Sequence, residues 1–497
     1  MRDGACQRHE ILIARLRSSG AARHGDGRRD EDAEGEREQE EAFRGHWATS
    51  VPDGAPNDNS SGSLDDVASG RRLIILVVAL ALVGAPAIAL RAFCVGESCA
   101  QEGGGTAAVP FCPLPADLRA HIEAGYRQGR SPDVMAATRD DQVVTDAGGV
   151  RVSWPSASVQ DTRVPIVFWG VGVNAGGLPD GTGLDQIAPT LESILGFSRP
   201  HPQVRAGVAV DGVASDDRPR LVIMIAWEGA GSAGLGAAPS ARRLVADLMQ
   251  RGAGTLDGTT GALPLDPTAG LTTIGTGALP SQHGITATLV RNDRGDVGPA
   301  WAEGAPLSVV STLAEDFDRG FDERPRIGLI AGRPTDRGLI GGSWYPEHDQ
   351  DQFRIGEDPL SSLRAMISTG FGSDDVTDIV GVALAGPLAD VSRTTRALVS
   401  RVMHANIPTT FVIAGTGQAS RRPPTTSIAD DVDAAIGAPV VAATVPGGLF
   451  LDQSIMAAND VTSDDVVRAM DAMKAEDGSP VFADAYPGFA ISFSRYC

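Results

Sequence analysis

From about Cys112 to Cys497, short apolar runs alternate with amphipathic stretches and turns. Residues 240–252 and 396–406 carry apolar side chains at helical spacing, which predicts helices. The apolar runs are rich in β-branched residues and lack polar alternation, as is typical of strands buried on both faces; they cover residues 164–173, 219–227, 325–332, 378–386 and 409–417. The pattern predicts an α/β fold with a mostly parallel central sheet and helices on both faces.

A different apolar segment lies ahead of this region. Residues 73–90 read LIILVVALALVGAPAIAL, without a charge, between Arg71–Arg72 and Arg91. Eighteen such residues are about the minimum that crosses a hydrocarbon core, so we expect one transmembrane helix over 71–92. A cleaved signal peptide is the alternative, but the polar lead is far longer than an ordinary n-region. The segment is therefore expected to stay as an anchor.

The segments that flank the expected span differ from the region that follows. Residues 1–70 are rich in charge and poor in large apolar side chains, which predicts a disordered cytoplasmic tail. Residues 93–111 include a Gly-rich stretch and are expected to form an extracytoplasmic linker, followed by the main domain at 112–497. The formal net charge of -21 argues against nucleic acid as a partner, because phosphate binding needs an excess of Lys and Arg.

The cysteines indicate the compartment. Cys94, Cys99, Cys112 and Cys497 follow the expected span, while Cys6 precedes it. Four cysteines on one side of a membrane form an even set, and disulfides persist outside the cytoplasm. We therefore expect a single-pass protein of the cell membrane with its C-terminal domain on the extracytoplasmic side.

Candidate catalytic and binding residues lie just after the predicted strands, where ligands bind in open α/β sheets. The run 219–227 is followed by Glu228, and a Thr-rich segment further on contains Thr268, Thr272 and Thr273 as possible nucleophiles. A threonine hydroxyl needs a base or a metal to be activated, so these residues alone do not define a site.

Four segments together resemble a known family. Residues 271–286, LTTIGTGALPSQHGIT, are similar to T-G-x-x-P-x-x-H-G-I of the alkaline phosphatase and nucleotide pyrophosphatase superfamily. Other family motifs are matched in part by GRSPDV at 129–134, by 152–173 and by DQIAPTLESILGF at 185–197, which is expected to be a short helix ended by Gly196. The resemblance extends over about Tyr126 to Ala490.

The order of these segments implies a circular permutation. DQIAPTLESILGF precedes the first core strand here, whereas its counterpart closes the ordinary family member. Residues 197–218 would then connect the family's former ends. Under this arrangement a Cys112–Cys497 bridge would rejoin the new opening, and Cys94 with Cys99 would close a local loop.

The family uses two divalent metal ions, zinc or manganese, held by Asp and His. Glu228 stands where the family has a first aspartate, and residues 415–417 read Gly-Thr-Gly where Asp-His-Gly is expected. Trp154 replaces one histidine, and Val382 stands near another histidine position after Asp378. The resemblance thus leaves Glu228 and Asp378 as residual metal ligands, and we expect a site without metal.

Three hypotheses remain open. The first is a membrane-anchored pseudoenzyme that binds an unknown envelope partner or a phosphoester ligand. The second is an active phosphoester or phosphodiester hydrolase with Thr268 as the nucleophile, Glu228 as a ligand and a possible metal-binding cluster at Glu347, His348, Asp349 and Asp351. The third is an exported α/β domain whose likeness to the family is coincidental.

Overall fold

The computed structural model describes residues 110–139, 143–147, 150–154, 159–302, 305–306, 308–341, 350–418, 427–475 and 478–497. The chain divides into two compact units, Met1–Gly103 and Gly104–Cys497, and every described residue belongs to the second. The expected tail, span and Cys94–Cys99 loop therefore lie outside the described residues. Within the described ranges, no helix combines the length and the apolar character that a membrane crossing requires.

The core of the domain is a mixed sheet of eight strands. In spatial order these are β11 (Gln352–Ile355), β10 (Ile327–Ala331), β12 (Asp378–Leu384), β6 (Leu221–Trp227), β13 (Thr409–Gly415), β4 (Arg163–Gly170), β7 (Ala253–Thr259) and β5 (Gly176–Gly177). The strands from β11 to β13 are parallel, whereas β4 runs antiparallel to both β13 and β7. All five strands predicted from apolar runs are confirmed, and the fold class is α/β.

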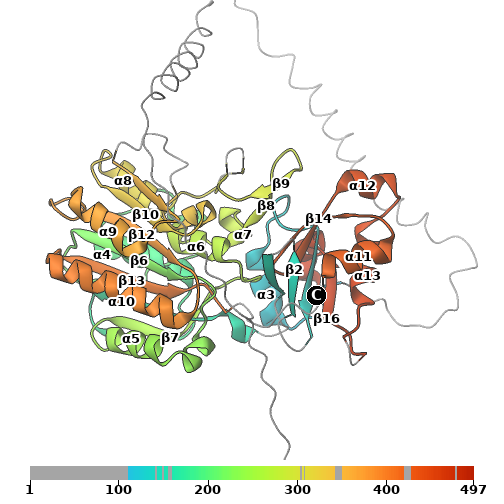
Figure 1. Ribbon diagram of the computed structural model, residues 1–497, viewed down its shortest axis with the longest axis horizontal. Coiled ribbons are helices and arrows are strands. Elements are labelled where there is room, and N and C mark those ends of the chain that lie inside the picture. The colour runs from blue at the N-terminus through green and yellow to red at the C-terminus, as the bar shows by residue number, and fades with distance from the viewer. Residues whose placement is uncertain are drawn as a thin grey trace, which may run out of the picture. The chain divides into compact units, whose positions relative to one another are not determined.

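Helices cover both faces of this sheet (Figure 1). Alternate residues of β6 enter different cores: Val222 and Met224 face one side, Ile223 and Ile225 the other. The first core is closed by α4 (Ile187–Leu195), α6 (Pro267–Thr276) and α8 (Leu313–Gly320). The second is closed by α5 (Pro239–Met249), α9 (Pro359–Ser368) and α10 (Leu388–Ala405). The helices predicted over 240–252 and 396–406 are thus confirmed as parts of α5 and α10.

The helix predicted at 185–197 is also confirmed. A short 3-10 turn, η2 (Leu184–Gln186), precedes α4, which ends at Gly196 with a φ of 63°. A positive φ is costly for residues with a Cβ, so glycine suits this end of the helix.

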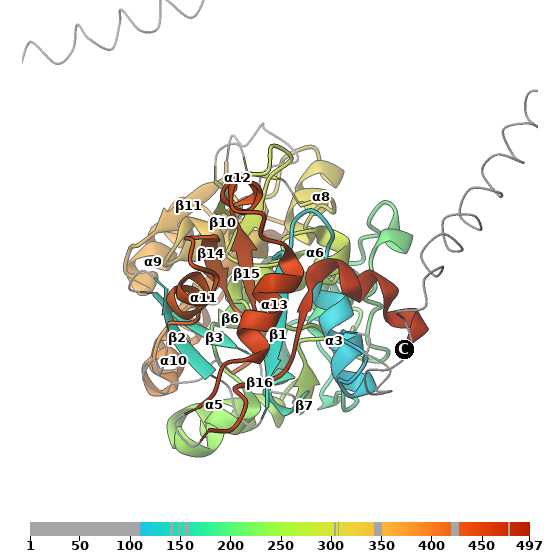
Figure 2. The same ribbon diagram turned by 90° about the vertical axis from the view of Figure 1, so that its right-hand side faces the viewer.

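A second sheet was not predicted from the sequence. Its four antiparallel strands are β14 (Val441–Val445), β15 (Gly448–Leu451), β1 (Val134–Thr138) and β16 (Phe482–Pro487). Three helices pack on it, as Figure 2 shows for the first and last of them: α11 (Ile428–Ile436), α12 (Gln453–Ala458) and α13 (Ser463–Asp471). Two further hairpins are formed by β2 (Val143–Ala147) with β3 (Val150–Trp154) and by β8 (Leu289–Arg291) with β9 (Val297–Pro299).

The two ends of the described chain are joined. The early strand β1 pairs with the late strand β16, and Cys112 forms a disulfide with Cys497 at a Cα–Cα distance of 5.1 Å. A small apolar core shared by α3 (Ala116–Gly125) and the C-terminal 3-10 segment η6 (Gly488–Tyr496) lies beside this bridge. The predicted Cys112–Cys497 bridge is therefore confirmed.

Candidate functional site

The candidate site lies at the carboxyl edge of the parallel strands. Glu228 directly follows β6, and its backbone N–H donates to the carbonyl of Leu384, the last residue of β12, at 2.9 Å. Arg333 follows β10, on the other side of β12. Because parallel strands end at the same edge, the side chains of Glu228 and Arg333 can meet across the end of β12.

Arg333 pairs with two carboxylates at this edge. Its guanidinium contacts Glu228 Oε2 and also Asp336 Oδ1 at 3.0 Å, while Asp336 Oδ2 accepts from the Arg333 backbone N–H at 3.0 Å. The Glu228 and Asp336 side chains are 5 % and 0 % exposed, whereas the Arg333 side chain is 46 % exposed. The chain itself thus supplies a cation that neutralises buried carboxylates and remains open to solvent.

The ionised form of Glu228 is disfavoured despite its pairing with Arg333. Burial, with the Asp336 charge as the next contribution, raises the pKa of Glu228 to about 7, although the Arg333 guanidinium acts in the opposite direction. In the described part of the protein, Oε1 of Glu228 is buried without a hydrogen-bond partner. Glu228 therefore titrates near neutral pH and has one acceptor atom left over.

A third carboxylate, Asp266, caps the first turn of α6. Its Oδ1 accepts from the backbone N–H groups of Thr268 at 2.9 Å and Ala269 at 3.3 Å, and its Oδ2 accepts from the Thr288 N–H at 2.9 Å. The Thr288 hydroxyl also donates to this carboxylate. Asp266 is buried, and its oxygens are occupied by the loop and helix that they hold.

Thr268, the predicted nucleophile, is the second residue of α6 and is 0 % exposed. Its hydroxyl lies 3.1 Å from the Thr288 hydroxyl. The hydroxyls of Thr272 and Thr273 donate to carbonyls one turn earlier in the helix, as threonines commonly do in helices. In the described structure no hydrogen bond joins Thr268 to Glu228 or Arg333; the Thr268 hydroxyl is bonded to Thr288, and the Thr272 and Thr273 hydroxyls are bonded within α6.

Close packing places Arg333 and Asp336 at this edge. They lie at the start of the 3-10 segment η5 (Pro334–Leu339), which packs on α6. A Cβ built on Gly275 of α6 would lie 2.4 Å from the Gly338 carbonyl oxygen, so only glycine permits this approach. Sequence reasoning missed Arg333 and Asp336, although Arg333 directly follows the predicted strand at 325–332.

The structure does not bring together Glu228 and Asp378, the two residues predicted as residual metal ligands. Asp378 opens β12 and pairs in register with Leu221, the first residue of β6, whereas Glu228 follows the last. A seven-residue rise of about 3.3 Å per residue separates the two levels by roughly 23 Å. Asp378 instead accepts from the backbone N–H groups of Arg326 and Gly372, each at 2.7 Å. The predicted strand at 378–386 already placed Asp378 at the start of its strand, whereas its assignment as a ligand came only from the family motif.

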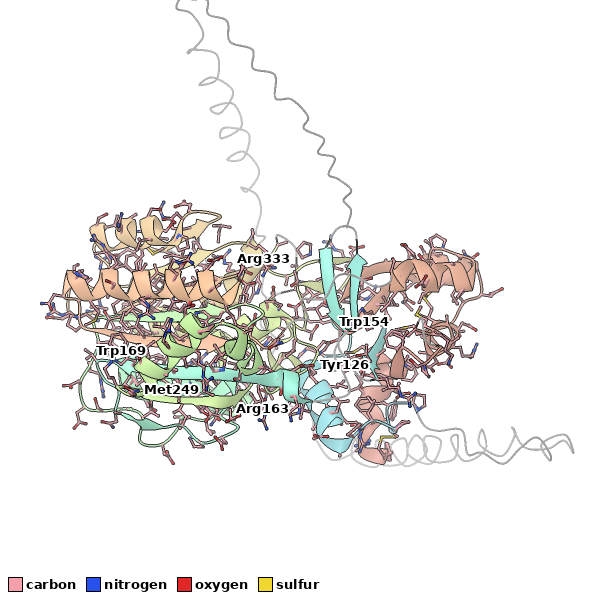
Figure 3. All side chains as sticks on the ribbon, turned by 60° about the horizontal axis from the view of Figure 1, so that its bottom comes forward. Tyr126, Trp154, Arg163, Trp169, Met249 and Arg333 are labelled. Atoms are coloured by element: carbon pink, nitrogen blue, oxygen red, sulfur yellow. A yellow bond between two sulfur atoms is a disulfide. The ribbon has the colours of Figure 1, made fainter. Side chains whose placement is uncertain are left out.

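Other positions singled out by the resemblance have structural partners. Trp154 packs edge-on against Phe482 at 5.5 Å in the core of the second sheet, away from Arg333 (Figure 3). Thr416, after β13, accepts from the Gly229 N–H at 3.0 Å and so ties two strand ends together. His283 is buried, and burial lowers its pKa to about 3, which keeps the imidazole neutral.

The donor set at the edge does not fit a pair of divalent cations. Of the predicted second cluster, Glu347, His348 and Asp349 lie outside the described residues. Across the described ranges, no group of three or more His, Cys, Asp or Glu side chains is placed to hold a metal ion. At the edge itself Asp266 and Asp336 are committed to other donors, and Glu228 retains one free oxygen. A two-metal site needs several convergent carboxylate and imidazole ligands.

No family model matches this chain, and no curated protein matches it.

Proposed function

We propose that this protein is a membrane-anchored, extracytoplasmic domain of the alkaline phosphatase superfamily type, circularly permuted, that binds a ligand or envelope partner without a catalytic metal pair. The supporting observation is the pairing of Arg333 with Glu228 and Asp336. In this proposal the guanidinium carries the positive charge that the family's metal ions would provide.

Electrostatics explains why this pairing disfavours a metal. A divalent cation at Glu228 would lie next to the guanidinium and be repelled by it, and displacing Arg333 would also leave the buried carboxylate of Asp336 without its partner. Charge-assisted pairs of Arg with carboxylates are among the stronger polar contacts in proteins. The exposed part of Arg333 can instead contact an anionic group such as a phosphoester.

The permutation has independent support in the chain ends. The Cys112–Cys497 bridge and the β1–β16 pairing hold the two ends together, as expected where a closed family member has been opened at a new place. β4 and β6 also lie in one sheet, separated only by β13. This arrangement supports the family resemblance over the hypothesis that the likeness is coincidental.

Metal analysis of the full-length protein purified without chelator tests the proposal. We expect far less than one equivalent of zinc or manganese per chain by inductively coupled plasma mass spectrometry, and no turnover of a nitrophenyl phosphodiester. The Arg333→Met variant should bind added Mn²⁺ more tightly than the wild type, because the competing cation is gone. Arg251→Met, a change at an exposed arginine stacked on Trp169, serves as the matched control. Close to two equivalents of metal in the wild type would refute the proposal.

One observation favours the hydrolase as a second candidate. The hydroxyls of Thr268 and Thr288 and the carboxylate of Asp266 form a continuous hydrogen-bonded chain, along which a proton could leave Thr268. Burial raises the pKa of Asp266 and so makes it a better base. A phosphorylated Thr268, or turnover lost in Thr268→Ala but kept in Thr273→Ala, would favour the hydrolase over the metal-free binding protein.

A further inference from the structure

The exposed aromatic side chains of the described protein gather in one short segment. Phe489, Phe493 and Tyr496 are 54 %, 54 % and 70 % exposed, and all three belong to η6. We call these three residues the aromatic patch. The other exposed large apolar residues are aliphatic or Met and lie elsewhere, at Val204, Val208, Val309 and Met403.

The segment that carries the aromatic patch is packed against the core of the domain. Ile491, within the same segment, is 3 % exposed and packs into the core beneath α3, together with Phe111 and Leu118. The rings of Phe493 and Tyr496 are stacked with centroids 6.4 Å apart, as expected for residues three apart in a 3-10 turn. One side of η6 is therefore fixed to the domain while its aromatic side chains face solvent.

A cation lies at the rim of the aromatic patch. The Arg495 guanidinium stands 4.8 Å from the centroid of the Tyr496 ring and donates to the Tyr496 hydroxyl at 3.0 Å. Aromatic rings with a neighbouring arginine are typical of surfaces that lie at the headgroup level of a bilayer, where the ring enters the acyl boundary and the charge stays among the headgroups.

The stretch of sequence between the disulfide and the proposed anchor is short. Tyr496 precedes Cys497, which is bonded to Cys112, and twenty residues, 92–111, separate Cys112 from Arg91 at the end of the expected span. Twenty residues reach at most roughly 70 Å at full extension. The disulfide thus holds the last residues of the chain next to Cys112, the first residue after the expected linker.

We propose that the aromatic patch of Phe489, Phe493 and Tyr496 docks on the outer surface of the lipid bilayer that carries the anchor. This inference rests on the proposed membrane anchoring and goes beyond it by assigning the face of the domain that meets the membrane. Three partly exposed rings bind a bilayer weakly by themselves, but a short tether gives them a high effective concentration at its surface. The disulfide then has a second role, because it holds η6 beside the tether.

Photolabelling of the full chain in phosphatidylcholine vesicles that contain a diazirine phosphatidylcholine tests the docking. After reduction and trypsin digestion, we expect lipid adducts on two peptides, 73–91 from the span and 475–495 with Phe489 and Phe493. The triple variant Phe489→Ser, Phe493→Ser, Tyr496→Ser should lose about tenfold or more of the adduct on 475–495, since it removes most of the apolar contact. Met403→Ser, at a side chain that is 53 % exposed on α10, is the matched control and should label as the wild type does.

Labelling of the two peptides distinguishes the proposed membrane anchor from the proposed docking of the aromatic patch. Adducts on 73–91 without adducts on 475–495 overturn the docking and leave the anchor standing, whereas loss of both refutes the anchor and the docking together. Equal labelling of 475–495 in the wild type and the triple variant also overturns the proposal. Because Ile491 and the disulfide are kept, the triple variant should unfold at the same temperature as the wild type. The single variant Phe493→Asp provides a second test of the docking, because it places a charge in the aromatic patch.

Discussion

Replacing Glu228 by glutamine tests the electrostatics of the candidate site directly. The substitution keeps the shape of the side chain but removes its charge at every pH. The pKa of Glu228 is raised from 4.5 to about 7 because the carboxylate is buried and lies near Asp336. The folded protein therefore binds the proton more tightly than the unfolded chain does.

The sign and size of the effect follow from proton linkage. A carboxyl whose folded pKa is raised costs stability when it ionises, so the free energy of unfolding of the wild type should fall as pH rises from about 4.5 to about 7. The rise of the Glu228 pKa from 4.5 to about 7 corresponds to a change of about 3 kcal/mol in the free energy of unfolding. Glu228→Gln should match the wild type near pH 4.5 and be more stable by up to about 3 kcal/mol above pH 7.

Urea denaturation of the full chain in detergent micelles, followed by tryptophan fluorescence across pH 4.5 to 8, measures this difference. Trp227, which directly precedes Glu228 and is fully buried, provides a probe at the site. Glu123→Gln, on the exposed surface of α3, is the matched control for the same chemical change. Parallel curves for the wild type and Glu228→Gln, or a variant that is less stable above pH 7, would show that Arg333 stabilises the ionised carboxylate and would refute the reasoning.

Three further changes probe the framework around the site. Cys112→Ser with Cys497→Ser should lower the free energy of unfolding by about 2 to 5 kcal/mol in chemical denaturation, because a bridge across 385 residues constrains the unfolded chain; an unchanged midpoint would contradict this. Gly275→Ala should cost about 1 to 3 kcal/mol, since its Cβ would lie 2.4 Å from the Gly338 carbonyl oxygen, and a melting temperature equal to that of the wild type would show that η5 shifts freely. Asp266→Ala should lower stability by at least about 1 to 2 kcal/mol by removing the cap of α6, with faster amide exchange in its first turn as the specific readout.

Local patterning was enough to predict the main elements of the central sheet. A strand buried on both faces needs a continuous apolar run, and β6 and β13 carry such runs with every residue buried. The same pattern did not reveal the second sheet, because β14 is half exposed and β15 and β16 are short segments whose partner strand, β1, lies far away in the sequence. Pairing over such separations is decided by packing rather than by local composition.

Sequence and tertiary structure also contributed differently to the candidate site. The sequence by itself determined that Glu228 follows a buried strand, because the apolar run ends there, whereas the bridge between the chain ends was implied by the family resemblance and its permuted segment order. Only the tertiary structure decided that β10 and β6 flank β12, so that Arg333 reaches Glu228 across the end of β12. The physical reason is that strand order and the close packing of η5 on α6 arise from contacts between distant segments, which no local pattern of residues encodes.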